Sequence, residues 1–185
     1  MIWFVLTYAV WFASEVYLSV FRRAGETVKQ KSDKGSLGLI WTIVIVANIL
    51  SYFVSRWVPA AIADNQNIRH AGLALIILGV ILRFTIVSSL GKFFTVNVVI
   101  AEDHKLKTDG FYRYLRHPSY SASILSFAGF GVSLNNWMSL ILIVTAISTA
   151  FLIRIRIEEE TLINHFGEEY EMYQKKAKRL IPFIY

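Results

Sequence analysis

The 185-residue chain contains no cysteine, three prolines and ten glycines, and only 17% of its residues are charged. The absence of cysteine excludes a disulfide scaffold, a cysteine-ligated zinc site and a cysteine nucleophile. The low proline and glycine content excludes a collagen-like or linker-rich chain. Soluble domains carry about 25% charged residues, so this chain has fewer charged residues than a typical soluble domain. Because 55% of the residues are hydrophobic, intrinsic disorder is excluded as well.

Several sequence motifs for common active sites are also missing. The chain has no GxGxxG, GxxxxGK[ST], HExxH or GxSxG pattern. A soluble Rossmann-type cofactor site, a nucleoside triphosphatase and a zinc hydrolase are therefore unsupported.

Positive charge is in excess, with 19 Lys and Arg against 13 Asp and Glu and a net charge of +6. A basic chain can bind nucleic acid, carry positive cytoplasmic loops or bind anionic ligands. Here 16 of the 19 basic residues fall within 22–34, 92–116 and 154–179. These segments share one side of a membrane if the apolar segments between them cross it in alternation. The charge therefore indicates topology, and a nucleic-acid partner loses its main support.

Five apolar segments predict transmembrane helices, because ~20 helical residues cross a hydrocarbon core of ~30 Å. We expect an all-α integral membrane protein whose residues 1–185 form one membrane domain. By the positive-inside rule the N-terminus is outside and the C-terminus is cytoplasmic. Small residues such as Gly129 and Ser133 predict tight packing of the fourth helix, and Asn135-Asn136 predicts a tight turn after it. The helices are expected at about 1–21, 37–58, 68–90, 119–134 and 137–157.

Two charged residues lie inside these predicted spans. Glu15 and Arg83 are expected at similar depth, near the cytoplasmic face. An uncompensated charge there costs at least ~2.5 kcal/mol, so we expect the two to pair. The pair is either a structural ion pair or a group that faces the substrate.

The first polar cluster in the cytoplasmic segments is Arg116-His117-Pro118-x-Tyr120. Pro118 favours an extended backbone at His117 and suits the first turn of a helix. Helix N-termini bind anions, and Arg116 and His117 would reinforce such binding. In the alternative interpretation Arg116 is a membrane anchor, His117 a neutral cap and Tyr120 an interfacial aromatic residue.

The second polar cluster is Arg154-x-Arg156-x-Glu158-Glu159. Glu158 lies four residues after Arg154, so the two share a helix face. A carboxylate pair can hold a cationic group or ribose hydroxyls, whereas surface solvation is the alternative. The basic tail from residue 175 predicts an amphipathic stretch at the membrane interface.

Both clusters resemble motifs of the isoprenylcysteine carboxyl methyltransferase family, which belongs to a wider group of membrane methyltransferases that includes phospholipid N-methyltransferases. The resemblance covers about residues 91–185, and the short five-helix chain looks like a prokaryotic-type member. The motif residues are Gly110-x-Tyr112-x3-Arg116-His117-Pro118-x-Tyr120 and Glu158-Glu159-x2-Leu162-x3-Phe166-Gly167-x2-Tyr170-x2-Tyr173, with Pro182 near the end.

The resemblance implies S-adenosyl-L-methionine as methyl donor, bound on the cytoplasmic side in a pocket that the C-terminal helical segment closes. It implies catalytic roles for Glu159 and for Arg154, which would orient the acceptor, and it implies no metal. The expected cofactor-binding residues are His104, Leu106, Gly110, Tyr112, Arg116, His117, Tyr120, Glu158 and Glu159.

The expected acceptor is a lipophilic small molecule or lipid in the membrane, foremost the carboxylate of an isoprenoid or a prenylcysteine-like compound. Methylation of a phospholipid amine, a thiol or a phenol stays open. A noncatalytic lipid-binding or assembly module is the alternative from a different class, and a nicotinamide-dependent membrane reductase is a third.

Overall fold

The computed structural model describes residues 2–21, 36–90 and 106–181, and this part of the chain is helical, as expected from its apolar runs. Its elements are α1 (Ile2–Phe21), α2 (Ser36–Trp57), α3 (Asn67–Leu90), the 3-10 helix η2 (Gly110–Arg113), α4 (Pro118–Ser133), α5 (Trp137–Phe166) and α6 (Glu168–Lys176).

The first four long helices begin and end within one residue of the expected bounds, but α5 continues nine residues beyond the expected end at 157. The expected end followed the length needed to cross a membrane. The residues after 157 contain no glycine or proline before Gly167, so nothing local stops the helix. Gly167 takes a φ of 52°, a conformation that favours glycine, and its N–H bonds to the carbonyl of Ile163.

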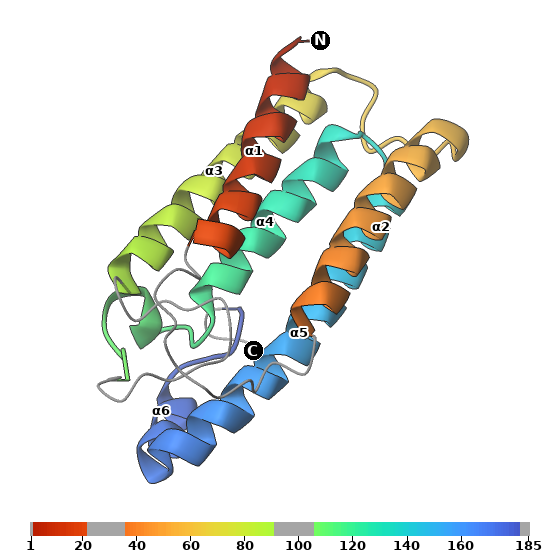
Figure 1. Ribbon diagram of the computed structural model, residues 1–185. Helices are drawn as coiled ribbons and strands as arrows, with labels where there is room; N and C mark the ends of the chain where they lie inside the picture. The colour runs from red at the N-terminus through yellow and green to blue at the C-terminus, as the bar shows by residue number, and fades with distance from the viewer. Residues whose placement is uncertain (1, 22–35, 91–105, 182–185) are drawn as a thin grey trace.

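The long helices alternate in direction, so that α1, α3 and α5 run one way and α2 and α4 run the other (Figure 1). Helix α3 packs on α4 and on α1, while α5 packs on both α4 and α2. The far end of α5 extends beyond its neighbours, and α6 and η2 lie at this same end of the bundle (Figure 1). The polar clusters recognised in the sequence therefore gather at one end.

Helices α3 and α4 approach closely because glycine and serine line the contact. A Cβ atom on Gly129 would lie 2.7 Å from the backbone nitrogen of Ile76, and one on Gly79 would lie 2.7 Å from the carbonyl of Ala122. Such separations leave no room for a side chain, so both glycines are required by the spacing of the helices. The expected small-residue packing of the fourth helix is confirmed.

Aromatic side chains of α1 pack against α4. The Trp11 ring meets the Phe127 ring at 4.9 Å in an edge-to-face contact, and the Tyr8 hydroxyl lies 2.7 Å from Ser133 Oγ. One turn beyond Trp11, Glu15 Oε2 lies 3.3 Å from Arg83 Nη2, so the expected pair forms between α1 and α3.

At the opposite end of the bundle, Asn135 and Asn136 make the expected turn between α4 and α5. Asn135 has a φ of 53°, a left-handed conformation that asparagine tolerates. Its side-chain oxygen accepts from the N–H groups of Ile62 and Ala63 at 3.1 and 3.0 Å. The turn therefore also anchors the connection between α2 and α3.

Among the described residues, three helices are long and apolar enough to cross a membrane, namely residues 38–57 of α2, the whole of α3, and α5. Many large apolar side chains on α2, such as Ile45, Ile49 and Phe53, are exposed. In a chain with this hydropathy an apolar outer face is suited to lipid. The fold is that of an integral membrane protein.

Candidate active site

The site begins where the C-terminal chain returns beside the residues that precede α4. Arg116 N–H donates to the Lys178 carbonyl at 2.7 Å, and Lys178 N–H donates to the Tyr114 carbonyl at 3.0 Å. One residue further, His117 N–H donates to the Arg179 carbonyl at 3.2 Å. These bonds form a short parallel pairing, so the basic tail is a built part of the site. The amphipathic pattern, which suggested a stretch along the membrane interface, did not indicate this pairing.

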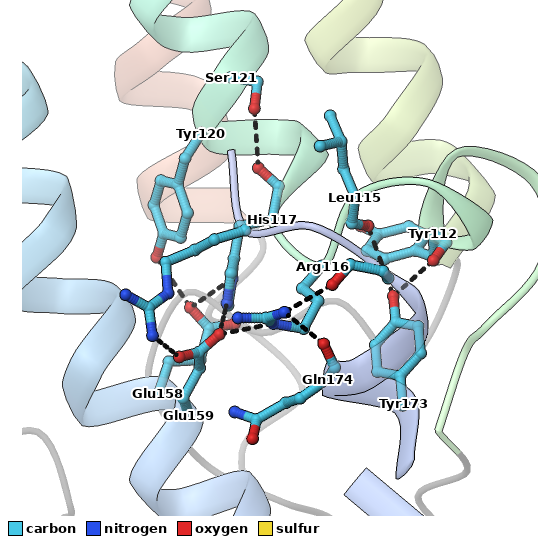
Figure 2. A network of polar contacts seen from close by, with 12 residues as sticks. Tyr112, Leu115, Arg116, His117, Tyr120, Ser121, Glu158, Glu159, Tyr173 and Gln174 are labelled. Carbon is cyan, nitrogen blue, oxygen red and sulfur yellow. Dashed lines mark hydrogen bonds and ion pairs between the residues drawn. The ribbon is translucent and has the colours of Figure 1, made fainter. Parts of the chain in front are cut away.

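Pro118 occupies the first position of α4, as its missing N–H allows. His117 precedes it with φ −125° and ψ 56°, so the expectation of an extended backbone at this residue was wrong. The reason is tertiary, because the His117 N–H is held by the tail while its carbonyl accepts from Tyr120 N at 3.1 Å. This conformation sets the imidazole against the acidic residues of α5 (Figure 2).

Glu159 is the centre of the polar network in Figure 2. Its Oε1 accepts from Arg116 Nε at 2.8 Å and lies 3.2 Å from His117 Nε2, while its Oε2 accepts from Arg179 Nη2 at 2.7 Å. Only 4% of Glu159 is exposed. Both carboxylate oxygens are engaged within the protein, so Glu159 fixes the positions of three nitrogen-bearing side chains.

Arg116 extends the network to the end of α6. Its Nη1 donates to the carbonyls of Gln174 and Ala177 at 3.1 and 2.5 Å. Carbonyls at a helix C-terminus lack intrahelical partners and carry partial negative charge, which suits a guanidinium. Arg116 therefore links α4, α5 and α6 through one side chain.

Glu158 differs from its neighbour in exposure and in partners. Its Oε2 accepts from the Tyr120 hydroxyl at 3.1 Å and lies 3.7 Å from His117 Nδ1. About a third of the side chain, 33%, is exposed. Within the described part of the chain, no donor is bonded to its Oε1. Glu158 is therefore the more exposed carboxylate of the pair and the one with fewer partners among the described residues.

Arg154 lies one turn before Glu158 on α5 and is 2% exposed. It is close enough to Tyr120 for its positive charge to act on the phenol. The Tyr120 ring in turn packs on Phe151 at 4.9 Å. The structure thus brings Arg154, Tyr120 and Glu158 together from α4 and α5, where the membrane part of α5 gives way to its polar extension.

The remaining predicted residues lie on the connection between α3 and α4. Gly110 begins η2 with a φ of 59° and is exposed, so its role is to turn the backbone. Tyr112 is buried with Ile86 and Ala122. Burial raises the pKa of Tyr112, and the negative charge of Glu158 raises it further, so this phenol stays neutral.

Leu106 packs against the buried cluster that Tyr170 and Tyr173 of α6 form with Ala177. His104 lies outside the described residues.

Sequence reasoning missed the parts played by Tyr173 and Arg179. The Tyr173 hydroxyl donates to the Tyr112 carbonyl at 2.5 Å, which ties α6 to η2. Burial raises the pKa of Tyr173, with the Arg116 charge opposing. The spacing of Tyr170 and Tyr173 in a short polar helix was a usable signal, because i and i+3 share a face. Nothing in the sequence separated Arg179 from the other basic residues of the tail.

The fold and the site define an integral membrane protein with a mixed-charge polar network at one end of its helix bundle. Residues 68–169 match the phospholipid methyltransferase family. Protein-S-isoprenylcysteine O-methyltransferase B of Arabidopsis thaliana is 32% identical over 146 residues, which are 78% of this chain and 74% of the relative. A probable protein-S-isoprenylcysteine O-methyltransferase of Oryza sativa is 35% identical over 63% of this chain and 62% of its own length.

A solved structure agrees with these relatives. The eukaryotic intramembrane Ras methyltransferase, an isoprenylcysteine carboxyl methyltransferase, matches with a TM-score of 0.73 and 28% identity over 96% of this chain and 64% of its own. The chain thus spans less than two thirds of that structure and of the rice relative. The chain belongs to the isoprenylcysteine carboxyl methyltransferase family of membrane methyltransferases, which confirms the resemblance seen in its motifs.

Proposed function

We propose that this protein transfers a methyl group from S-adenosyl-L-methionine to a lipophilic acceptor in the membrane. The observation that carries the proposal is the arrangement of Glu158 beside the Glu159 network. Its Oε2 accepts from the Tyr120 hydroxyl, a third of its side chain is exposed, and no donor from the described residues is bonded to its second oxygen. Family membership supplies the class of reaction. The donor contributes an electrophilic methyl group on a sulfonium.

The described residues fit such a donor. An open carboxylate oxygen on Glu158 suits the ammonium or the ribose hydroxyls, and the cationic side chains around Glu159 suit the carboxylate end. Because both oxygens of Glu159 are engaged by Arg116, His117 and Arg179, we assign it a positioning role in place of the catalytic role expected from the resemblance. Removing Glu159 would release all three partners at once.

For the acceptor we favour a carboxylate of the isoprenylcysteine type, the group named in the relatives. Arg154 is a buried cation at the apolar side of the site, and a buried guanidinium attracts a carboxylate and repels an ammonium. An ionised carboxylate also needs no general base. Alignment and exclusion of water are then the main requirements for the reaction.

A phospholipid amine is the second candidate, favoured by the family description that matches residues 68–169. An ammonium must lose a proton before it can attack, so this reaction would need a base and its rate would rise with pH. The pH profile of methyl transfer therefore separates the two acceptors.

We further propose that the whole chain is one membrane domain with five spans, with the N-terminus outside and the site on the cytoplasmic side. The alternating helix directions and the grouping of 16 of the 19 basic residues support this orientation. Helices α1 and α3 end, and α2 and α4 begin, at the end of the bundle that carries α6 (Figure 1).

The proposal is tested with detergent-purified protein and radiolabelled S-adenosyl-L-methionine. We expect saturable binding by calorimetry and methyl transfer to N-acetyl-S-farnesyl-cysteine in preference to phosphatidylethanolamine. Glu158→Gln should weaken donor binding, whereas Glu160→Gln, on an exposed side chain two residues further, should leave it unchanged. Absence of binding by the folded wild type would refute a donor-dependent enzyme and would leave a noncatalytic membrane module.

A further inference from the structure

Tyr170 carries a buried hydroxyl that has no hydrogen-bond partner in the described part of the chain. The residue is 1% exposed, and no described group donates to or accepts from its Oη atom. The ring is well packed, with Leu106, Leu162, Ile163 and Phe166 around the cluster it forms with Tyr173. A buried hydroxyl without a partner loses its bonds to water and gains nothing in return. A phenylalanine would fill the same space without this cost.

Tyr173 provides the internal comparison. It lies three residues later on α6, in the same cluster, and its ring is 5.9 Å from that of Tyr170. Its hydroxyl donates to the Tyr112 carbonyl at 2.5 Å. The fold thus satisfies one phenol of the pair completely and leaves the other without a partner, although both are buried to a similar degree.

The charges of the polar network act on the Tyr170 hydroxyl. Besides burial, the charges that act on it most strongly are those of Glu159 and Glu158, followed by Arg116, and the two carboxylates raise the pKa of Tyr170. The cluster that Tyr170 forms with Tyr173 and Ala177 packs against Leu162 and Ile163 of α5, each one turn after a residue of the acidic pair. The cluster that contains Tyr170 therefore packs on α5 one turn beyond the acidic pair, and the Tyr170 hydroxyl stays a neutral donor.

The partners that the fold itself offers are already engaged. Both oxygens of Glu159 are occupied, and Arg116 is bonded to α5 and α6. Among the described residues of this network, what remains is the second oxygen of Glu158, an acceptor, and the Tyr170 hydroxyl, a donor. A group that donates to the one and accepts from the other satisfies both. An alkyl hydroxyl can both donate and accept, whereas a carboxylate can only accept and an ammonium can only donate.

We propose that Tyr170 is a ligand-binding residue whose hydroxyl donates to a ribose hydroxyl of the methyl donor, while that ribose hydroxyl donates to Glu158. The inference rests on the proposed function and adds α6 to the site. It also explains why α6 is tied so firmly through Tyr173 and Arg116, since the position of the Tyr170 hydroxyl depends on that of the helix.

The test measures binding of S-adenosylhomocysteine and of its 2′-deoxy and 3′-deoxy analogues to wild type, Tyr170→Phe and Tyr173→Phe in detergent. Melting of each unliganded protein is followed by tryptophan fluorescence. We expect Tyr170→Phe to melt at or above the wild-type temperature and to bind S-adenosylhomocysteine about three- to tenfold more weakly. Tyr173→Phe should melt lower, because it leaves the Tyr112 carbonyl unpaired.

The analogues identify the atom. One of the two deoxy compounds should bind wild type more weakly than S-adenosylhomocysteine does, and this difference should shrink in Tyr170→Phe. Equal binding by Tyr170→Phe and wild type would overturn the inference, as would a loss of binding that follows a lowered melting temperature. Sensitivity to neither deoxy position would overturn the ribose assignment. Failure of the wild type to bind at all refutes the proposed function instead, so the two failures are distinct.

Discussion

Glu158 and Glu159 are adjacent carboxylates, yet the structure predicts opposite consequences for their replacement by glutamine. Glu159 is 6% exposed in its side chain and pairs with Arg116, which is 10% exposed. Removing one partner of a buried ion pair costs about 3–5 kcal/mol, because the other charge is left uncompensated. Glutamine keeps one acceptor oxygen, so about 3 kcal/mol is the appropriate figure for Glu159→Gln.

For a chain of this length, 1 kcal/mol corresponds to about 2–4 °C in melting temperature. We therefore expect Glu159→Gln to melt about 6–12 °C below the wild type. The pair with Arg179 adds little to this figure, because the Arg179 side chain is 25% exposed and water screens it. Glu158→Gln loses one hydrogen bond at a third-exposed site and should melt within about 3 °C of wild type.

The assay is thermal unfolding in detergent without ligand, followed by intrinsic fluorescence, with Glu160→Gln as the exposed control on the same helix. Donor affinity is then measured below the melting temperature of every variant. The expected pattern is loss of stability in Glu159→Gln and loss of affinity in Glu158→Gln. If Glu159→Gln melted with the control, or Glu158→Gln melted as low as Glu159→Gln, the division into a positioning and a ligand-binding carboxylate would be wrong.

Three further predictions concern packing, topology and pH. Gly129→Ala should cost about 1–3 kcal/mol, because its Cβ would lie 2.7 Å from the backbone of α3, whereas Gly38→Ala meets nothing within 4 Å and should be neutral or stabilising by thermal unfolding. In the cysteine-free chain, Asn65→Cys should react with an impermeant maleimide in intact cells, and Lys176→Cys only after permeabilisation. The pKa of Tyr173 is higher in the folded than in the unfolded protein, so this phenol stabilises the fold fully below its ordinary pKa of about 10. That stabilisation is lost as the pH rises from there through the pKa of the folded state. Tyr173→Phe should therefore show a smaller fall in melting temperature above a pH of about 10 than the wild type does.

Each of these has a contrary result. Equal melting of the two glycine variants would mean that α3 and α4 are not in contact at Gly129. Labelling of Lys176→Cys in intact cells would reverse the proposed orientation. An unchanged alkaline slope in Tyr173→Phe would mean that other groups determine the loss of stability there.

Local sequence was sufficient for the helices wherever their ends carry a local signal. Pro118 begins α4 and the asparagine pair ends it, both as expected. The fifth helix was misjudged because its expected end came from membrane thickness, a property of the surroundings. Its actual end comes from Gly167, the first residue after 157 whose backbone conformation stops a helix. The end of α5 is thus set by a local feature of the chain and not by the thickness of the membrane.

The composition of the site was also predictable from the sequence. Arg116, His117, Tyr120 and the acidic pair were all expected there, and the structure brings them within hydrogen-bonding distance of one another. Their separate tasks were not predictable. Adjacent residues on a helix point about 100° apart. The Glu159 carboxylate therefore bonds Arg116 and Arg179, while the Glu158 carboxylate bonds Tyr120.

The sequence by itself determined an all-helical membrane protein, the gathering of its basic residues in three segments, and the membership of a methyltransferase family, because apolar length, charge placement and short motifs are local properties of the chain. Only the tertiary structure decided that Arg116 and Arg179 engage both oxygens of Glu159, and that the Tyr170 hydroxyl has no partner among the described residues. Those outcomes depend on contacts across 20 or more residues between α4, α5, α6 and the returning tail. Contacts between residues so far apart in the sequence are set by the packing of whole helices, and no single segment of the sequence encodes them.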